Sequence, residues 1–269
     1  MKRGITPRQV DIRELQAILR QTGALQDEDP IKPPLSLPLP SDAQYADATQ
    51  ALAQVPDAVI QNCVHALSRD EPQDAVWMLA HIGKRAQPAL LNALNADTPQ
   101  MRFWAAVALA MQGRDDGAHE LLTCLKERRA DVPEGRKTVP MWQAVMVLLG
   151  RIRAKEAVPE LIKVLEDKSI NLDALLTAVR ALGRIGDSSA VPALLQLLQR
   201  NDLPAQRQFQ ISTGAVNAVV EDARWQIELT VAEALALLGA PQPQIVEKYL
   251  NDQRAYVRQY AHRVMEIKA

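Results

Sequence analysis

Imidazole and thiol groups are among the side chains that most often bind a transition metal or attack a substrate. They belong to His65, His81, His119, His262, Cys63 and Cys124. Only His119 is followed by a glutamate, and the cysteines lack the C-x-x-C and Cys/His spacings of zinc and redox sites. We therefore expect histidines on helix surfaces, buried free thiols, and no metal or cofactor in this chain.

Motifs for catalysis and nucleotide binding are missing as well. The sequence contains no G-x-G-x-x-G segment, no P-loop and no G-x-S-x-G segment. Most of its 11 glycines fall at predicted helix ends. The sequence therefore predicts no catalytic residue, and any chemistry near this protein would be supplied by another polypeptide.

Charge and hydropathy restrict the partners and the compartment. The 31 basic and 32 acidic residues leave a net charge of −1, which gives no field that would attract phosphate backbones or anionic lipid. No apolar run follows Lys2 and Arg3, and no stretch approaches the roughly 18 apolar residues that span a bilayer. We expect neither a nucleic acid nor a membrane as partner. As written the chain is expected in the cytoplasm, or in the periplasm if it is a fragment of an exported protein.

The elements that position these side chains are predicted to be helices. Apolar content is 48%, but the aromatic residues that are enriched in strands make up only 4%. Two stretches, residues 149–165 and 182–198, share Leu-Gly-Arg-Ile and Ala-Val-Pro at an offset of 33 residues, and residues 75–91 resemble them. A fixed period of this length is typical of stacked pairs of helices. Pro192 suits the first turn of one helix, and Gly186 can take the left-handed conformation that ends the other.

The recurring A-V-P-x-L-x-x-L and A-x-x-A-L-G-x-I-G segments resemble HEAT repeats of the bacterial type found in phycocyanobilin lyases. Asp97 with Arg102, and Asp252 with Arg258, resemble the Asp and Arg positions of that family. The resemblance implies an all-α, right-handed α-solenoid of about six HEAT-like helix pairs, with pairs beginning near residues 56, 86, 117, 157, 190 and 242. Its continuous core is expected at Leu79, Ile82, Leu149, Leu161, Leu182, Leu194 and Leu235.

That family includes scaffolds, lyases and hydroxylases. HEAT-type iron hydroxylases need several His-Glu pairs, and this chain has only His119-Glu120. HEAT-type DNA glycosylases need a strongly basic groove, which a nearly neutral chain does not provide. A lyase needs the same fold, so the repeat pattern leaves it open.

Three segments make up the predicted domain organisation: a helical segment at residues 1–25, a proline-rich linker at 26–43 and the solenoid at 44–269. In the first, Asp11 can cap a helix that Gly23 ends, and five prolines follow it in the linker. Residues 4–25, with T-P-R-x-V-D-x-x-x-L-Q, resemble the C-terminal end of bacterial FAD-dependent oxidoreductases, some of which carry HEAT-like repeats. The resemblance implies a flavin-dependent oxidoreductase domain as a partner. The alternative is an ordinary capping helix.

Candidate binding residues come from two insertions and from the tryptophans. Residues 129–140 and 201–220 each follow a first helix and precede a second one, so both should leave from the same edge. They supply cationic, polar and aromatic candidates, joined by two tryptophans: Arg136, Lys137, Arg207, Gln208, Phe209, Trp142 and Trp225. Core filling is the favoured role for the tryptophans, and anchoring a partner on the concave face is the alternative. Arg102 and Arg258 are predicted to bind turn carbonyls or a nearby Asp, with anion binding as the alternative.

Two functions remain after these exclusions. The first is a non-catalytic scaffold that binds a protein partner, for example as the C-terminal accessory domain of an FAD-dependent oxidoreductase. The second is a lyase-like enzyme subunit that acts on a bound chromophore or similar ligand. The sequence identifies neither the partner, nor a substrate, nor the oligomeric state.

Overall fold

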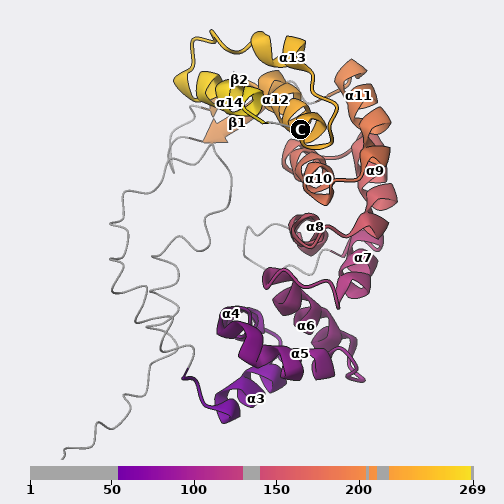
Figure 1. The fold of residues 1–269 in the computed structure, drawn as a ribbon, viewed down its shortest axis with the longest axis vertical. Coiled ribbons are helices and arrows are strands. Elements are labelled where there is room, and N and C mark those ends of the chain that lie inside the picture. Colours follow the sequence, from indigo (N-terminus) through magenta and orange to yellow (C-terminus); the bar gives the residue numbers. More distant parts are fainter. Residues whose placement is uncertain (1–53, 130–139, 204–205, 211–217, 268–269) are drawn as a thin grey trace, which may run out of the picture. The chain divides into compact units, whose positions relative to one another are not determined.

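Helices make up most of the structure, a computed structural model that describes residues 54–129, 140–203, 206–210 and 218–267 (Figure 1). The first helices of the pairs are α3 (Asp57–Ala66), α5 (Gln87–Ala93), α7 (Ala118–Lys126), α9 (Val158–Glu166), α11 (Val191–Gln199) and α13 (Pro243–Glu247). The second helices are α4 (Gln73–Ile82), α6 (Pro99–Met111), α8 (Met141–Arg151), α10 (Leu172–Ile185), α12 (Arg224–Leu237) and α14 (Ala255–Met265).

The predicted all-α class and the six HEAT-like helix pairs are confirmed for the described residues. Three first helices follow a short 3₁₀ turn: Gly83–Ala86 before α5, Lys155–Ala157 before α9 and Ser188–Ala190 before α11. Pro159 and Pro192 lie in the first turns of α9 and α11, where a missing N–H costs nothing. The segments 1–25 and 26–43 lie outside the described residues, so the predicted domain boundaries stay a prediction.

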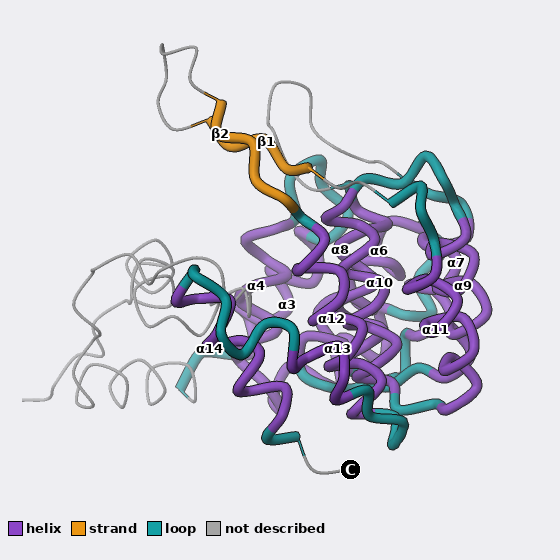
Figure 2. Tube along the Cα trace, turned by 90° about the horizontal axis from the view of Figure 1, so that it is seen from above, coloured by secondary structure: helices purple, strands orange, loops and turns teal. Residues whose placement is uncertain are grey.

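The chain forms two compact units, residues 1–108 and 109–269, with the boundary inside α6. In the N-terminal unit, α3 packs on α4 and α5. In the C-terminal unit, α7, α9 and α11 lie side by side in one layer and α8, α10 and α12 in the next (Figures 1 and 2). α10 packs on α8, α9 and α12, which makes it the central helix of this unit. The right-handed winding concerns both units together and stays a prediction.

The predicted core residues are all buried. Leu79, Leu149, Leu161, Leu182, Leu194 and Leu235 are fully inaccessible and Ile82 is 7% exposed. Asn171 caps the N-terminus of α10, with its side-chain oxygen 2.8 Å from the backbone N–H of Ala174. Gly186 ends the same helix with a φ of 78°, the left-handed conformation expected there. Arg153 occupies the equivalent position after α8 with a φ of 54°, where a side chain is strained.

Two helical glycines let the second helices approach each other closely. A Cβ atom added to Gly183 of α10 would lie 2.9 Å from the Cα atom of Ala234 in α12. A Cβ atom added to Gly150 of α8 would lie 3.0 Å from the Cα atom of Ala181 in α10. Real Cβ atoms are essentially never found as close to backbone as 2.9 Å, so the position of Gly183 requires glycine, whereas a side chain at Gly150 would require α10 to shift by a few tenths of an ångström.

A β-hairpin occupies the second insertion, which the sequence predicted as a loop. Strand β1 (Gln206–Gln210) pairs antiparallel with β2 (Ala218–Asp222), and in Figure 2 both extend away from the helix layers. The register places Arg207 opposite Glu221 and Phe209 opposite Val219. Each strand is only five residues long, too short to give a clear alternating pattern in the sequence, which explains the difference from the prediction.

Replacing Gly183 with Ala should destabilise the protein by about 1–3 kcal/mol, because the new methyl group would overlap the backbone of α12. Helix propensity alone predicts the opposite sign, a gain of about 0.5–1 kcal/mol. Urea unfolding of the Gly183→Ala and Gly150→Ala variants measures the difference. Thr177→Ala, in the solvent-facing stripe of α10, is the matched control without a clash. A stabilised Gly183→Ala protein would show that the two helices are not in contact there.

Candidate functional site

Both insertions leave from connections between a first and a second helix, as predicted. Residues 130–139 lie between α7 and α8, and the hairpin lies between α11 and α12. We call the connections that follow α7, α9 and α11 the turn edge. Its described residues are Arg128 and Arg129, Asp167 to Ile170, and Arg200 to Leu203.

The base of the first insertion is held together by an arginine and a tryptophan. The backbone N–H of Trp142 donates to the carbonyl of Arg129 at 3.0 Å, which brings the two ends of the insertion together. The guanidinium of Arg128 lies 4.5 Å from the centre of the Trp142 ring, a cation–π contact. Arg128 has a φ of 52°, a conformation that L-residues rarely adopt. Trp142 is partly exposed at this base.

Ion pairs connect consecutive turns along the edge. Arg128 lies 3.6 Å from Asp167 of the next turn, and Lys168 lies 3.9 Å from Asp202 of the turn after that. Hydrogen bonds from the hydroxyl and the backbone N–H of Ser169 lower the pKa of Asp167, and the charge of Arg128 adds to this effect. Three helix pairs thus contribute to one charged row.

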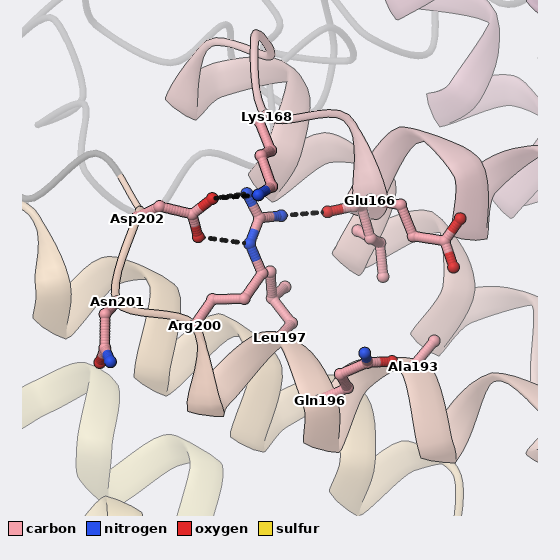
Figure 3. A pocket seen from close by; sticks show the side chains of 9 residues that line it. Glu166, Lys168, Ala193, Gln196, Leu197, Arg200, Asn201 and Asp202 are labelled. Atoms are coloured by element: carbon pink, nitrogen blue, oxygen red, sulfur yellow. Dashed lines mark hydrogen bonds and ion pairs between the residues drawn. The ribbon is translucent and has the colours of Figure 1, made fainter.

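Arg200 fixes the last of these turns. It binds Asp202 at 2.8 Å and donates to the carbonyl of Leu165 in α9 at 2.5 Å (Figure 3). A hollow of about 480 Å³ lies beside it. The lining residues come from α9, α11 and the turns that follow them: Leu165, Glu166, Lys168, Ala193, Gln196, Leu197, Arg200, Asn201 and Asp202. Leu165 and Leu197 are each only 2% exposed, so the hollow has a buried apolar floor and a polar rim.

The base of the hairpin is anchored by Arg224 at the start of α12. Its guanidinium donates to the carbonyls of Leu198 at 2.8 Å and Arg200 at 3.1 Å and binds Glu228 at 2.8 Å. Glu228 also accepts from Tyr249 at 3.0 Å. Burial of Glu228 opposes its ionisation, but hydrogen bonds from Arg224 and Tyr249 and the charge of Lys248 lower its pKa.

The predicted binding residues lie in different parts of the structure, and two of them are not described. Arg136 and Lys137 lie outside the described residues. Arg207, Gln208 and Phe209 fall in β1, and Trp142 lies at the base of the first insertion. Trp225 is 2% exposed, with its ring 5.6 Å from that of Tyr256, so its position agrees with core filling. The binding roles of these residues stay predictions.

Arg102 and Arg258 bind turn carbonyls, which confirms their predicted structural contacts. Arg102 donates to the carbonyls of Ala96 at 2.9 Å and Asp97 at 3.1 Å. Arg258 makes the equivalent bonds to Asp252 at 2.6 Å and to Gln253 at 3.0 Å. Each arginine therefore closes the turn that precedes its own helix.

The histidines and cysteines lie where the sequence predicted. His65, His119 and His262 are exposed on helices. His81 is partly exposed and stacks on Trp77 with ring centres 4.5 Å apart, so its ring packs against the same helix. Cys63 and Cys124 are buried, and burial raises the pKa of the Cys63 thiol. Within the described ranges, His, Cys, Asp and Glu residues form no group of three or more that could hold a metal ion.

A second surface, which sequence reasoning missed, is the solvent-facing side of α8, α10 and α12. Its residues repeat at equivalent helix positions and comprise Val147, Arg151, Arg180, Arg184, Glu233 and Leu237. We call it the second-helix face. The signal was available in the sequence, since Arg151 and Arg184 both follow the glycine of the Leu-Gly-Arg-Ile repeat.

Comparison with known proteins supports the fold and leaves the activity open. Residues 142–212, 71 of 269, match the family model of HEAT repeats. The complex of CpcE and CpcF of phycocyanin lyase from Nostoc sp. PCC7120 is similar at 20% identity and a TM-score of 0.42, over 98% of this chain and 90% of that one.

An engineered protein is similar at 18% identity and a TM-score of 0.41, over 95% of this chain and 70% of that one. At these values neither structure indicates an activity for this chain. No curated protein matches it. None of the helices described here is both long and apolar enough to cross a membrane.

Acid should weaken the last helix pair through Asp252. Hydrogen bonds from the Arg254 side chain lower the pKa of Asp252 from 3.8 to about 2, although burial opposes them. Because the folded-state pKa is depressed, the stabilisation is complete above about pH 4 and is lost as the pH falls towards 2. An NMR titration of the Asp252 carboxyl group measures this pKa. Asp252→Asn should make the free energy of unfolding less dependent on pH in this range, and an ordinary pKa near 3.8 would contradict the geometry.

Proposed function

We propose that this protein is a non-catalytic scaffold that binds a protein partner at its turn edge. The observation that carries the proposal is that ion pairs along the turn edge connect the bases of both insertions. The hollow lies beside the same ion pairs. Arg128 contacts the base of the first insertion and pairs with Asp167, while Arg200 and Arg224 hold the base of the second.

The chemistry of this edge suits a protein surface. A buried apolar floor at Leu165 and Leu197, surrounded by charged and amide side chains, resembles the apolar centre and polar rim of protein interfaces. Bonded turns also hold the bases of the insertions in place, which lowers the entropy lost on binding. Lys168, whose side chain is 83% exposed and lies 3.9 Å from Asp202, can turn to pair with a carboxylate of the partner as well.

The proposed partner contains a flavin-dependent oxidoreductase domain. Support for this finer statement comes from residues 4–25, which resemble the C-terminal end of FAD-dependent oxidoreductases. In that arrangement the helical pairs act as the accessory domain, and the flavin domain supplies the chemistry.

Removing both insertions should abolish binding and leave the fold intact. Residues 130–139 and 204–222 would each be replaced by a short Gly-Ser turn, a change that costs little because loop-closure entropy varies slowly with length. A partner captured by the intact protein and identified by mass spectrometry would be purified and titrated against both forms. We expect binding at least tenfold weaker without the insertions, a similar melting temperature, and flavin absorbance in the partner.

Lys126→Glu, an exposed change on α7, is the matched control and should bind the partner normally. Equal affinity of the intact and shortened proteins would move the interface away from the turn edge. A partner without flavin would reject the oxidoreductase association alone.

A further inference from the structure

The second-helix face combines positive charge with exposed apolar side chains. Val147 is 44% exposed and Leu237 is 50% exposed, and they lie on α8 and α12, on either side of α10. Between them α10 presents Arg180 and Arg184, which are neighbours on one side of the helix because they are four residues apart. Arg151 adds a third arginine from α8.

Little acidic charge lies on the three helices of this face. α8 contains no Asp or Glu, and α10 contains only Asp173, at its N-terminal end. In α12 the charge of Glu228 is balanced by Arg224, whereas Glu233, which accepts a hydrogen bond from the neutral Tyr260 hydroxyl at 2.5 Å, leaves one carboxylate on this face beside the three arginines. Across the described ranges neither Arg151 nor Arg180 forms an ion pair with a carboxylate.

The first-helix layer of the same unit has a different surface. On α9, Lys163 pairs with Glu160 at 2.8 Å, and Glu166 at the end of the helix leaves the helix with a net negative charge. The combination of arginines with exposed aliphatic side chains is compatible with a protein-binding surface, where Arg is enriched and apolar groups adjoin a polar rim. The second-helix face therefore differs from α9 of the first-helix layer in the sign of its charge.

Close helix packing makes this face continuous. The Cδ1 atom of Leu237 would lie 3.5 Å from a Cβ atom added to Gly183, directly beside Arg184. Val147 precedes Gly150, the glycine that contacts α10, by one turn of α8. Neighbouring packed helices lie about 8–10 Å apart, so the two aliphatic side chains are roughly 16–20 Å from each other, with the arginines between them.

We propose that the second-helix face is a docking surface, distinct from the turn edge, for an acidic amphipathic segment of a protein partner. The segment carries at least two carboxylates between two apolar side chains, matching the arginines and the two aliphatic residues. A nucleic acid would satisfy the arginines but would leave Val147 and Leu237 without partners.

Selection from a display library of random peptides tests this chemistry, because the selection does not require the natural partner. The intact protein should enrich peptides in which acidic residues lie between apolar ones. A synthetic copy of the most enriched peptide would then be titrated against purified variants. Binding should be at least tenfold weaker in the Arg180→Glu, Arg184→Glu double variant, several-fold weaker in Val147→Ser and Leu237→Ser, and weaker at high salt.

Lys126→Glu carries the same type of charge reversal on the first-helix layer and should bind the peptide normally. Melting temperatures of all variants establish that they are folded. The proposal is overturned if no peptide is enriched, if the enriched peptides are not acidic, or if charge reversal leaves binding unchanged. Tighter binding of a single-stranded oligonucleotide than of the peptide, or self-association lost on charge reversal, would also overturn it. Shortening the two insertions should leave peptide binding intact, which separates this surface from the turn edge.

Discussion

Close approach of neighbouring second helices is the constraint on which the C-terminal unit depends. α10 contacts α8 where Gly150 faces Ala181, and it contacts α12 where Gly183 faces Ala234. Short turns join most second helices to their first helices, so the first-helix layer follows the same spacing. This spacing brings Arg128 within 3.6 Å of Asp167 on the next turn. The bonded row of the turn edge and the continuous second-helix face both follow from it.

The turn edge can carry insertions because their ends are fixed by the helix layers. Leu203 and Ala223, which flank the hairpin, are buried at 8% and 0% exposure, so the chain returns to the core at both ends. Arg224 adds hydrogen bonds to the carbonyls of Leu198 and Arg200. An insertion held in this way can change in length and sequence without disturbing the packing of α11 and α12.

Sequence reasoning recovered the helix pairs and the core because both follow from a repeated apolar pattern. Leu182 and Leu194 repeat at fixed offsets, and both are inaccessible in the structure. The hairpin was missed because its strands are only five residues long and lie inside a polar insertion. The second-helix face was missed for another reason. Arg180 belongs to a candidate binding surface only because exposed side chains of α8 and α12 lie beside it. Which side chains lie beside it depends on how closely the three helices pack.

The glycine–alanine contacts between second helices also determine how helix pairs can be added to the array. α10 carries both halves of the contact, since Ala181 faces α8 and Gly183 faces α12. A tandem copy of residues 157–189 would therefore present an alanine to the glycine of the preceding second helix and a glycine to the alanine of the next one. The array could lengthen by gene duplication without a change in either interface. The shared Leu-Gly-Arg-Ile and Ala-Val-Pro segments of residues 149–165 and 182–198 are what such a duplication would leave in the sequence.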